Sequence, residues 1–222
     1  MTTVARRSIP YVTSRTGEEA DSALFLCSGR GGDGLLRLAY RDEGRDDRDI
    51  KDVLWARVSQ NIGSDRLPEG DAEWKLVHPA RQRETMLFLR CQVCVRPAKG
   101  VTTAQLPDRP GVLFLETAGP GLGRPIRTAQ PPVCVEHAHE AARRCKHLVR
   151  NGHVALLATR FRLYGVLGTP YTWTPTGVRA LPGSDDPVPY GDPRLRWFLA
   201  SQLVRELREY EVVNLADLVP AA

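Results

Sequence analysis

Four side chains with the chemistry of metal ligands occur as two pairs in this chain of 222 residues. Cys91 and Cys94 form a C-x₂-C pair, and Cys134 and His137 form a C-x₂-H pair further along the chain. Thiolate sulfur and imidazole nitrogen are the ligands that Zn²⁺ takes in structural sites, where four of them surround the ion as a tetrahedron. The intervening loop adds little cost, because the entropy of closing a loop grows only with the logarithm of its length. The sequence therefore predicts one zinc ion bound by these four residues.

Cys145 and His147 follow the second pair within the same expected helix. In a continuous helix Cys145 would lie about 12 Å along the axis from His137, too far to share an ion whose ligand bonds are about 2.0–2.3 Å long. Three interpretations stay open: Cys145 is a buried thiol, Cys145 and His147 begin a second metal site, or a shorter helix lets one of them replace His137. The residues that could complete a second site are His153, His78 and Cys27.

The elements beside each pair determine whether the four ligands can meet. A helix is expected over 80–89, directly before the first pair, and a buried strand over 111–116. Gly and Pro residues between that strand and the second pair indicate turns. Good helix formers over 135–149 then place the second pair at the start of a helix.

This order of elements resembles the treble-clef zinc fold, with CQVC as the knuckle and CVEH at the start of the helix. The resemblance covers about residues 90–150 and implies metal binding, but no single activity, because treble clefs serve nucleases, ribosomal proteins, transcription factors and protein-interaction modules. The stretch CQVC…PPVCVEHAHEAARRCKHL is also similar to that of small uncharacterised zinc-binding proteins of Streptomyces and related actinobacteria. A treble-clef HNH nuclease needs a His general base after the knuckle, and residues 97–130 contain no His.

We expect an α+β fold in three regions. Residues 1–89 form a β-rich N-terminal region, residues 90–150 form the zinc-binding module, which is treble-clef-like, and residues 151–222 form a short antiparallel sheet and a C-terminal helix. The three regions could pack as one compact unit. At this length the chain can bury a core without disulfide staples.

The N-terminal region is expected to contain three strands and one helix. Apolar or β-branched runs predict strands over 9–13, 23–27 and 35–40, and the glycine-rich stretch Gly29–Gly34 predicts a hairpin connection between the last two. Apolar residues at helical spacing predict a short helix over 49–60.

The C-terminal region is expected to begin with a strand over 153–167 and a hairpin between 171–173 and 178–181. Asp192 followed by Pro193 is typical of a helix start. Apolar residues then recur at helical spacing and predict one buried face, formed by Leu195, Phe198, Leu199, Leu203 and Leu207.

The charge of the chain is concentrated around the predicted metal module. The net charge is +5, but residues 86–165 contain 12 Lys and Arg against 4 Asp and Glu. A basic surface is typical of nucleic-acid binding, and we expect DNA rather than RNA. The residues expected to contact phosphate are Arg127, Arg143, Arg144, Lys146 and Arg150. The competing interpretation is a solvated basic face in an arginine-rich chain, since 27 of its 31 basic residues are Arg.

Two further functions stay open: a protein-interaction module stabilised by zinc, and a metalloenzyme of actinobacterial secondary metabolism. An enzyme is disfavoured, because four protein ligands leave no open position on the ion, and no catalytic residue is assigned. No apolar run approaches the roughly 18 residues of a membrane span, so we expect a cytoplasmic, regulatory or nucleic-acid-binding protein.

Overall fold

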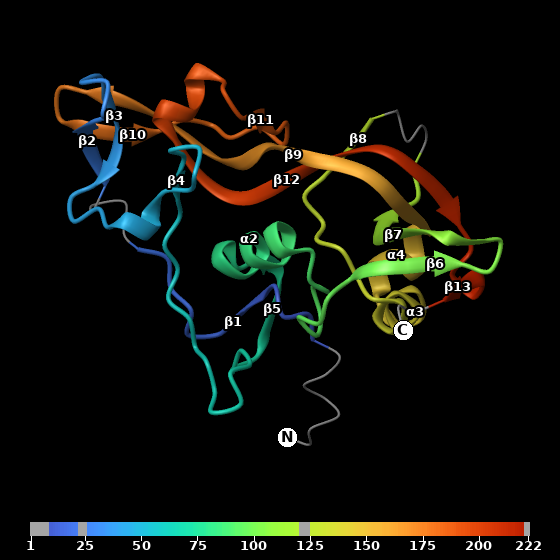
Figure 1. Ribbon diagram of the computed structural model, residues 1–222. Coiled ribbons are helices and arrows are strands. Elements are labelled where there is room, and N and C mark those ends of the chain that lie inside the picture. The colour runs from blue at the N-terminus through green and yellow to red at the C-terminus, as the bar shows by residue number, and fades with distance from the viewer. Residues whose placement is uncertain (1–8, 22–25, 120–124, 220–222) are drawn as a thin grey trace. The chain divides into compact units, whose positions relative to one another are not determined.

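The computed structural model describes residues 9–21, 26–119 and 125–219 (Figure 1). Strands contain 46% of the residues and helices contain 18%. The fold is therefore mostly β, and the predicted α+β class is wrong. In the described part of the chain, no helix is both long and apolar enough to cross a membrane.

The main sheet has the strand order β13-β6-β7-β9-β12-β4, with β10 and β11 paired to β9 and β8 paired to β12. Two smaller sheets pair β1 with β5 and β2 with β3. The strands are β1 (Thr13–Arg15), β2 (Leu26–Arg30), β3 (Leu36–Tyr40), β4 (Leu54–Trp55), β5 (Ala72–Val77), β6 (Lys99–Thr103), β7 (Leu106–Thr117), β8 (Ile126–Thr128), β9 (His153–Thr174), β10 (Gly177–Ala180), β11 (Val188–Pro189), β12 (Phe198–Val213) and β13 (Leu218–Val219). The α-helices are α2 (Pro79–Phe88), α3 (Val135–Arg144) and α4 (Lys146–Asn151), and the 3₁₀ helices are η2 (Arg45–Asp47), η3 (Pro193–Trp197) and η4 (Leu215–Asp217).

The chain divides into two compact units. Unit 1 comprises Met1–Val12, Arg81–Leu163 and Val204–Ala222, and unit 2 comprises Thr13–Ala80 and Tyr164–Leu203. The long strands β9 and β12 therefore contribute residues to both units.

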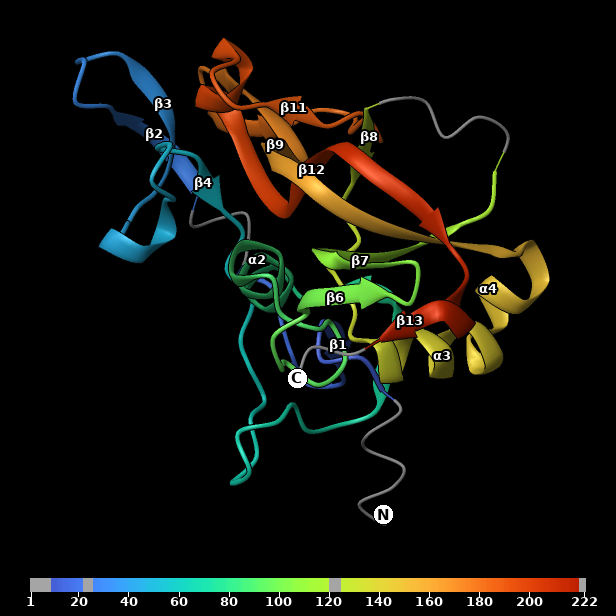
Figure 2. The same ribbon diagram turned by 45° about the vertical axis from the view of Figure 1, so that its right-hand side comes forward.

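Unit 1 contains both predicted ligand pairs within one hydrophobic core. Strands β7 and β9 pair antiparallel from Val112↔Ala158 to Thr117↔His153, which confirms the strands predicted over 111–116 and 153–167. Figures 1 and 2 show α3 and α4 beside β13 and the β6–β7 hairpin. The buried members of this core are Cys91, Ala98, Val101, Leu113, Leu115, Val133, Val135, Ala138, Ala155, Leu157 and Leu218.

Helix α2, which confirms the helix predicted over 80–89, is held in unit 1 by a buried arginine. The Arg205 guanidinium donates from Nε to the Met86 carbonyl at 2.9 Å and from Nη2 to the Leu87 carbonyl at 3.2 Å. These bonds satisfy carbonyls at the C-terminal end of the helix, where a cation is also favoured by the helix dipole. Burial lowers the pKa of Arg205 to about 10, and its guanidinium lies 5.2 Å from the centre of the Phe161 ring.

The predicted C-terminal helix is wrong, because residues 198–213 form strand β12. Asp192 does cap a helix, accepting a hydrogen bond from the Arg194 N–H, but this is the five-residue 3₁₀ helix η3. All five residues of 203–207 are buried in succession. A strand covered on both faces permits such a run, whereas an amphipathic helix would expose some of those positions.

Unit 2 is built from short strand pairings. The β2–β3 hairpin runs from Leu26↔Tyr40 to Arg30↔Leu36, as predicted from the glycine-rich stretch, although residues 23–25 of the predicted strand 23–27 lie outside the described part. The predicted hairpin of β9 and β10 is also confirmed, with Val178 paired to Trp173. The helix predicted over 49–60 is wrong, since this stretch contains β4, which pairs parallel with β12.

Unit 2 buries apolar residues such as Val53, Val166 and Leu203, and it contains an apolar cluster around β3. The fully buried members of this cluster are Leu38, Tyr40 and Leu54, with Tyr171, Val178, Trp197 and Leu199 partly buried around them. Gly168 lets β9 approach β12 here, because a Cβ at this position would lie 2.1 Å from the Leu199 carbonyl oxygen.

Candidate metal centre

Cys91, Cys94, Cys134 and His137 lie together in unit 1 and could bind a metal ion. One ligand atom from each residue falls within 4.8 Å of all the others. The Cys94 and Cys134 sulfurs are 3.9 Å apart, and His137 Nδ1 lies 3.9 Å from the Cys91 sulfur and 3.1 Å from the Cys134 sulfur. Two sulfurs bound at about 2.3 Å to a tetrahedral zinc ion would be about 3.8 Å apart, so the donor set fits such an ion.

The first pair lies in a tight turn directly after α2. The Cys91 N–H donates to the Arg96 carbonyl at 2.8 Å, and the Val95 N–H donates to the Cys91 carbonyl at 2.9 Å. The Val93 N–H also donates to the Cys91 sulfur at 3.5 Å. Val95 closes the turn with a φ of 63°, a left-handed conformation that is unfavourable for a β-branched residue. The surrounding contacts must therefore hold this turn in shape.

The second pair lies at the start of α3, as predicted. Cys134 is the N-cap residue, and its carbonyl accepts from the Ala138 N–H at 2.9 Å. His137 therefore falls in the first turn of the helix, one turn from Cys134 and on the same side.

Gln92 joins the two ligand pairs. Its N–H donates to the Pro132 carbonyl at 2.9 Å, and its side-chain amide donates to the Pro131 carbonyl at 3.1 Å. Two bonds from a residue between Cys91 and Cys94 thus fix the segment that leads into Cys134.

Burial differs among the four ligands. Cys91 is fully buried and His137 is 6% exposed, whereas Cys94 and Cys134 are partly exposed. One side of the site is therefore part of the hydrophobic core and the other side faces the surface.

Charged side chains contact two of the four candidate ligands. Arg96 Nε donates to the Cys94 sulfur at 3.3 Å, and the same guanidinium forms an ion pair with Glu136. On the far side of the His137 ring, Nε2 lies 3.9 Å from the Glu140 carboxylate while Nδ1 faces the sulfurs. A carboxylate behind a histidine is the usual outer partner of a histidine metal ligand.

The crowding of donors shifts the pKa values within the site. Hydrogen bonding with Cys134 raises the pKa of Cys91 and lowers that of Cys94, and it raises the pKa of His137 to about 10. Hydrogen bonding with Cys94 also raises the pKa of Arg96, which keeps this side chain charged. A divalent cation exerts a stronger field than these neighbours and deprotonates its thiol ligands, so metal binding releases protons.

Cys145 is not in this cluster. The helix predicted over 135–149 is interrupted at Cys145, which ends α3 and precedes α4. The His147 ring lies 3.0 Å from the Thr117 hydroxyl through Nε2 and 3.1 Å from the Asn151 amide through Nδ1. Among the residues that the structure describes, the Cys₃His group is the only set of three or more candidate ligands, so no third ligand joins Cys145 and His147.

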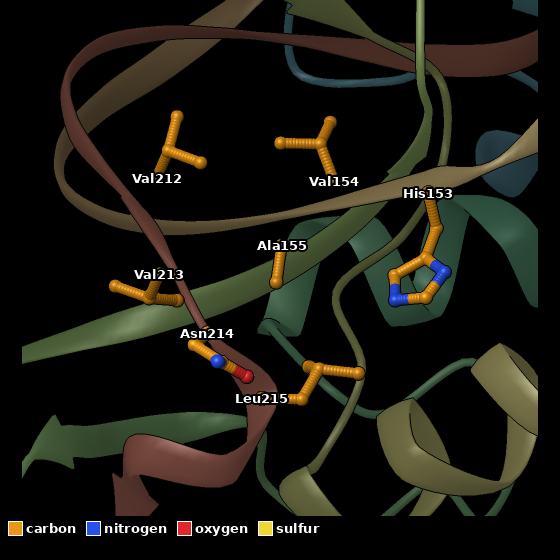
Figure 3. A pocket seen from close by; sticks show the side chains of 7 residues that line it. All are labelled: His153, Val154, Ala155, Val212, Val213, Asn214 and Leu215. Atoms are coloured by element: carbon orange, nitrogen blue, oxygen red, sulfur yellow. The ribbon is translucent and has the colours of Figure 1, made fainter.

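His153, considered for a second metal site, lines a hollow of about 160 Å³ (Figure 3). The other lining residues are Val154, Ala155, Val212, Val213, Asn214 and Leu215. Aliphatic side chains dominate this lining and no Cys, Asp or Glu contributes to it, so the hollow offers His153 no partner for a metal ion.

The basic residues expected to contact nucleic acid occupy two places in unit 1. Arg143, Arg144, Lys146 and Arg150 are exposed on α3 and α4. Because the helix breaks at Cys145, they do not share one continuous helical face. Arg127 lies on β8 with its Nε 3.7 Å from the Glu206 carboxylate.

Comparison with protein-family models, with curated proteins and with solved structures finds no match for this chain. Sequence reasoning identified the four candidate ligands but did not predict the contacts that Arg96, Gln92 and Glu140 make around them. A local signal existed for two of these, because Gln92 lies inside the first pair and Glu140 follows His137 by three positions, where helical side chains meet.

Proposed function

We propose that Cys91, Cys94, Cys134 and His137 bind one zinc ion with a structural role. The observation that carries this proposal is the sulfur–sulfur distance of 3.9 Å together with the convergence of all four ligand atoms. Three thiolates and one imidazole favour zinc over Ca²⁺ or Mg²⁺, which take oxygen ligands. Four protein ligands complete the tetrahedron, so the ion has no open position for a substrate.

The proposed ion would join a tight turn to the start of a helix, the arrangement of a treble-clef-like module. Cys91 and Ala138, on either side of the site, belong to the same buried core. The ion would therefore fix the position of α3 relative to the Cys91–Cys94 turn, adding to the two hydrogen bonds that Gln92 donates to Pro131 and Pro132. In this role zinc contributes directly to the folding free energy.

The test is elemental analysis of purified protein. We expect about one equivalent of zinc per chain, lost in Cys91→Ser and Cys134→Ser. Cys27→Ser is the matched control, since Cys27 lies in unit 2, and it should keep the metal. Wild-type protein that is metal-free and fully folded would contradict the proposal, as would a Cys91→Ser variant with stoichiometric zinc.

We further propose that the zinc-ordered unit binds nucleic acid, DNA rather than RNA. Support comes from the exposure of Arg143, Lys146 and Arg150, for which no acidic partner occurs among the described residues. Such side chains would release counterions from a phosphate backbone, which makes the affinity steeply salt-dependent. Arg144 lies beside them, 3.3 Å from Glu140.

This second proposal is tested by fluorescence anisotropy with duplex oligonucleotides at salt concentrations of roughly 50–300 mM. We expect binding that weakens steeply with salt, and a smaller salt slope for the triple variant Arg143→Ala, Lys146→Ala, Arg150→Ala. Absence of binding by wild-type protein at the lowest salt concentration would remove the proposal.

A further inference from the structure

Three arginines from three strands of unit 1 converge on the carboxylate of Glu206. Arg162 on β9 and Arg208 on β12 each place Nε 2.9 Å from Glu206 Oε1, and Arg127 on β8 places Nε 3.7 Å from Oε2. Because β12 lies between β9 and β8, Glu206 occupies the middle of this group. We call Arg127, Arg162 and Arg208 the arginine triad.

Burial separates the carboxylate from the cations around it. The Glu206 side chain is 5% exposed, whereas those of Arg127, Arg162 and Arg208 are 48%, 53% and 40% exposed. Burial raises the pKa of Glu206, but hydrogen bonds from Arg162 and Arg208 lower it by more, so the carboxylate stays ionised. One buried anion beneath three half-exposed cations leaves a net charge of +2 at the surface.

The direction of contact leaves hydrogen-bond donors available. Arg162 and Arg208 both reach Glu206 through Nε, and within the described part of the chain their terminal Nη groups contact no protein acceptor. These Nη groups carry most of the donors of a guanidinium and bind phosphate oxygens in pairs. Contact with Glu206 thus holds the guanidinium groups of Arg162 and Arg208 in place and leaves their Nη donors available to a ligand.

Fixing the side chains in advance favours binding. An exposed arginine loses roughly 0.5–1.5 kcal/mol of rotamer freedom when a ligand immobilises it. Contact with a buried carboxylate has already restricted Arg162 and Arg208, so less entropy remains to be lost. A solvated basic face would instead show arginines without a common buried anchor.

We propose that the arginine triad binds phosphate groups of a nucleic-acid backbone. This inference rests on the proposed nucleic-acid binding and assigns part of it to the sheet rather than to α3 and α4. Neighbouring strands lie about 4.8 Å apart, so the triad spans about 10 Å across three strands, more than one nucleotide's rise of about 3.4 Å. A group of this width and charge matches a polyanion better than a single carboxylate.

The experiment compares salt-dependent duplex binding of wild-type protein with that of Arg162→Ala, Arg208→Ala. We expect the double variant to bind about tenfold more weakly near 0.1 M salt and to lose about two from its salt slope, one for each phosphate contact. The matched control is Arg45→Ala, Arg179→Ala, which removes the same charge from exposed positions in unit 2 and should bind like wild type. Zinc content and circular dichroism confirm that each variant is folded.

Two more variants keep the test decisive if the double alanine variant fails to fold. The double variant Arg162→Lys, Arg208→Lys keeps the positive charge but lacks the planar guanidinium groups. We expect it to bind several-fold more weakly, with a nearly unchanged salt slope. Glu206→Gln raises the local charge to +3. Weaker binding by Glu206→Gln supports the role of Glu206 in positioning the arginines, whereas tighter binding shows that charge alone matters and overturns that role.

The outcomes separate this inference from the proposal on which it rests. If wild-type protein binds no duplex, nucleic-acid binding itself is refuted. If wild type binds and the Arg162 and Arg208 variants bind equally well, the triad assignment is overturned while nucleic-acid binding stands. If a poly-glutamate peptide competes as well as an oligonucleotide of equal charge, the ligand is not specifically a phosphate backbone and the assignment is also overturned.

Discussion

Unit 1 and unit 2 differ in what holds them together. Unit 1 has a core of buried apolar residues from several strands and α3, and Cys91, one of the four candidate metal ligands, belongs to that core. Unit 2 also buries apolar side chains, including Val53, Val166 and Leu203, but contains no candidate metal group among its described residues. Dependence on a metal ion should therefore be confined to one part of the chain.

Polar networks add to the apolar contacts in unit 2. The Asp49 carboxylate accepts hydrogen bonds from the backbone N–H groups of Lys51 and Val53, from the Trp55 indole and from the Tyr190 hydroxyl. A second network surrounds Arg57, which contacts Asp21, Asp42 and Asp47 and lies 4.1 Å from the centre of the Tyr40 ring. The two units thus differ in chemistry, because unit 1 contains a candidate metal group and unit 2 contains networks of charged hydrogen bonds.

Metal removal is the largest expected perturbation and would separate the units most sharply. Structural zinc contributes on the order of 10 kcal/mol to the folding of small domains, so chelation should unfold much of unit 1. Hydrogen exchange followed by mass spectrometry should show loss of protection in peptides from 90–150, while peptides covering β2 and β3 keep theirs. Uniform loss of protection along the chain would show that the units do not unfold independently.

Asp49→Ala tests the other side of the comparison. Removing an acceptor of four hydrogen bonds, three of them part-buried, should lower the free energy of unfolding by about 3 kcal/mol, because the donors lose their partners. Urea unfolding followed by Trp fluorescence measures this loss. Asp49→Asn keeps one acceptor oxygen and should lose less. Zinc content should not change in either variant, and a loss of metal in Asp49→Ala would break the proposed separation.

Glu116→Gln probes a buried carboxyl in unit 1. Burial raises the pKa of Glu116 to about 7, while a hydrogen bond from Thr128 opposes the shift. The folded state therefore binds this proton more tightly than the unfolded state, and its contribution to stability is complete below about pH 4.5 and is lost as pH rises through 7. At pH 8 the Gln variant should be more stable than wild type by about 2–3 kcal/mol.

The measurement for Glu116 is the difference in unfolding free energy between the two proteins from pH 5 to pH 8. Comparison at each pH removes the contribution of the metal ligands, which both proteins share. A difference that does not grow with pH would show that the Glu116 carboxyl is ionised at little cost.

Cys145→Ser should have the smallest effect. Cys145 is half-buried at the break between α3 and α4 and lies outside the Cys₃His group. We expect the variant to keep one equivalent of zinc and to change stability by less than about 1 kcal/mol. Loss of metal in this variant would refute the ligand assignment.

The sequence predicted the metal cluster because its information is local. Each pair of ligands is separated by two residues, and a tight turn or the first turn of a helix brings such residues together without help from the rest of the chain. The neighbours that bridge the pairs could not be predicted, because the contact from Gln92 to Pro131 and Pro132 depends on how distant segments meet.

The prediction of a C-terminal helix was wrong for a physical reason, which the burial of the residues shows. Leu195, Leu199 and Leu203 recur every four positions, but Ala200 and Val204, each one position after a member of this series, are buried and Leu199 is only partly so. When both faces of a strand are covered, its apolar residues form a nearly continuous run, and a helical subset can always be selected from it. The capping signal at Asp192 was correct locally but could not fix the length of the element that followed.

The arginine triad could not be predicted from the sequence, because the information that defines it is not local. Arg127, Arg162 and Arg208 are widely separated along the chain, and only the pairing of β8, β9 and β12 brings them to one carboxylate. Arg127 was predicted to contact nucleic acid, but with the residues of α3 and α4. The charge composition of a chain gives the number of its cationic side chains, but it does not show which of them contact the same buried carboxylate.

The passage of β9 and β12 through both units has a consequence for biosynthesis. Each unit is assembled from separate stretches of chain, and β9 and β12 leave the ribosome after the two ligand pairs. All four ligands, by contrast, have been translated once His137 is made, before either long strand begins. A zinc ion bound by the nascent polypeptide would hold the middle of the chain together until the strands that complete both units have been translated.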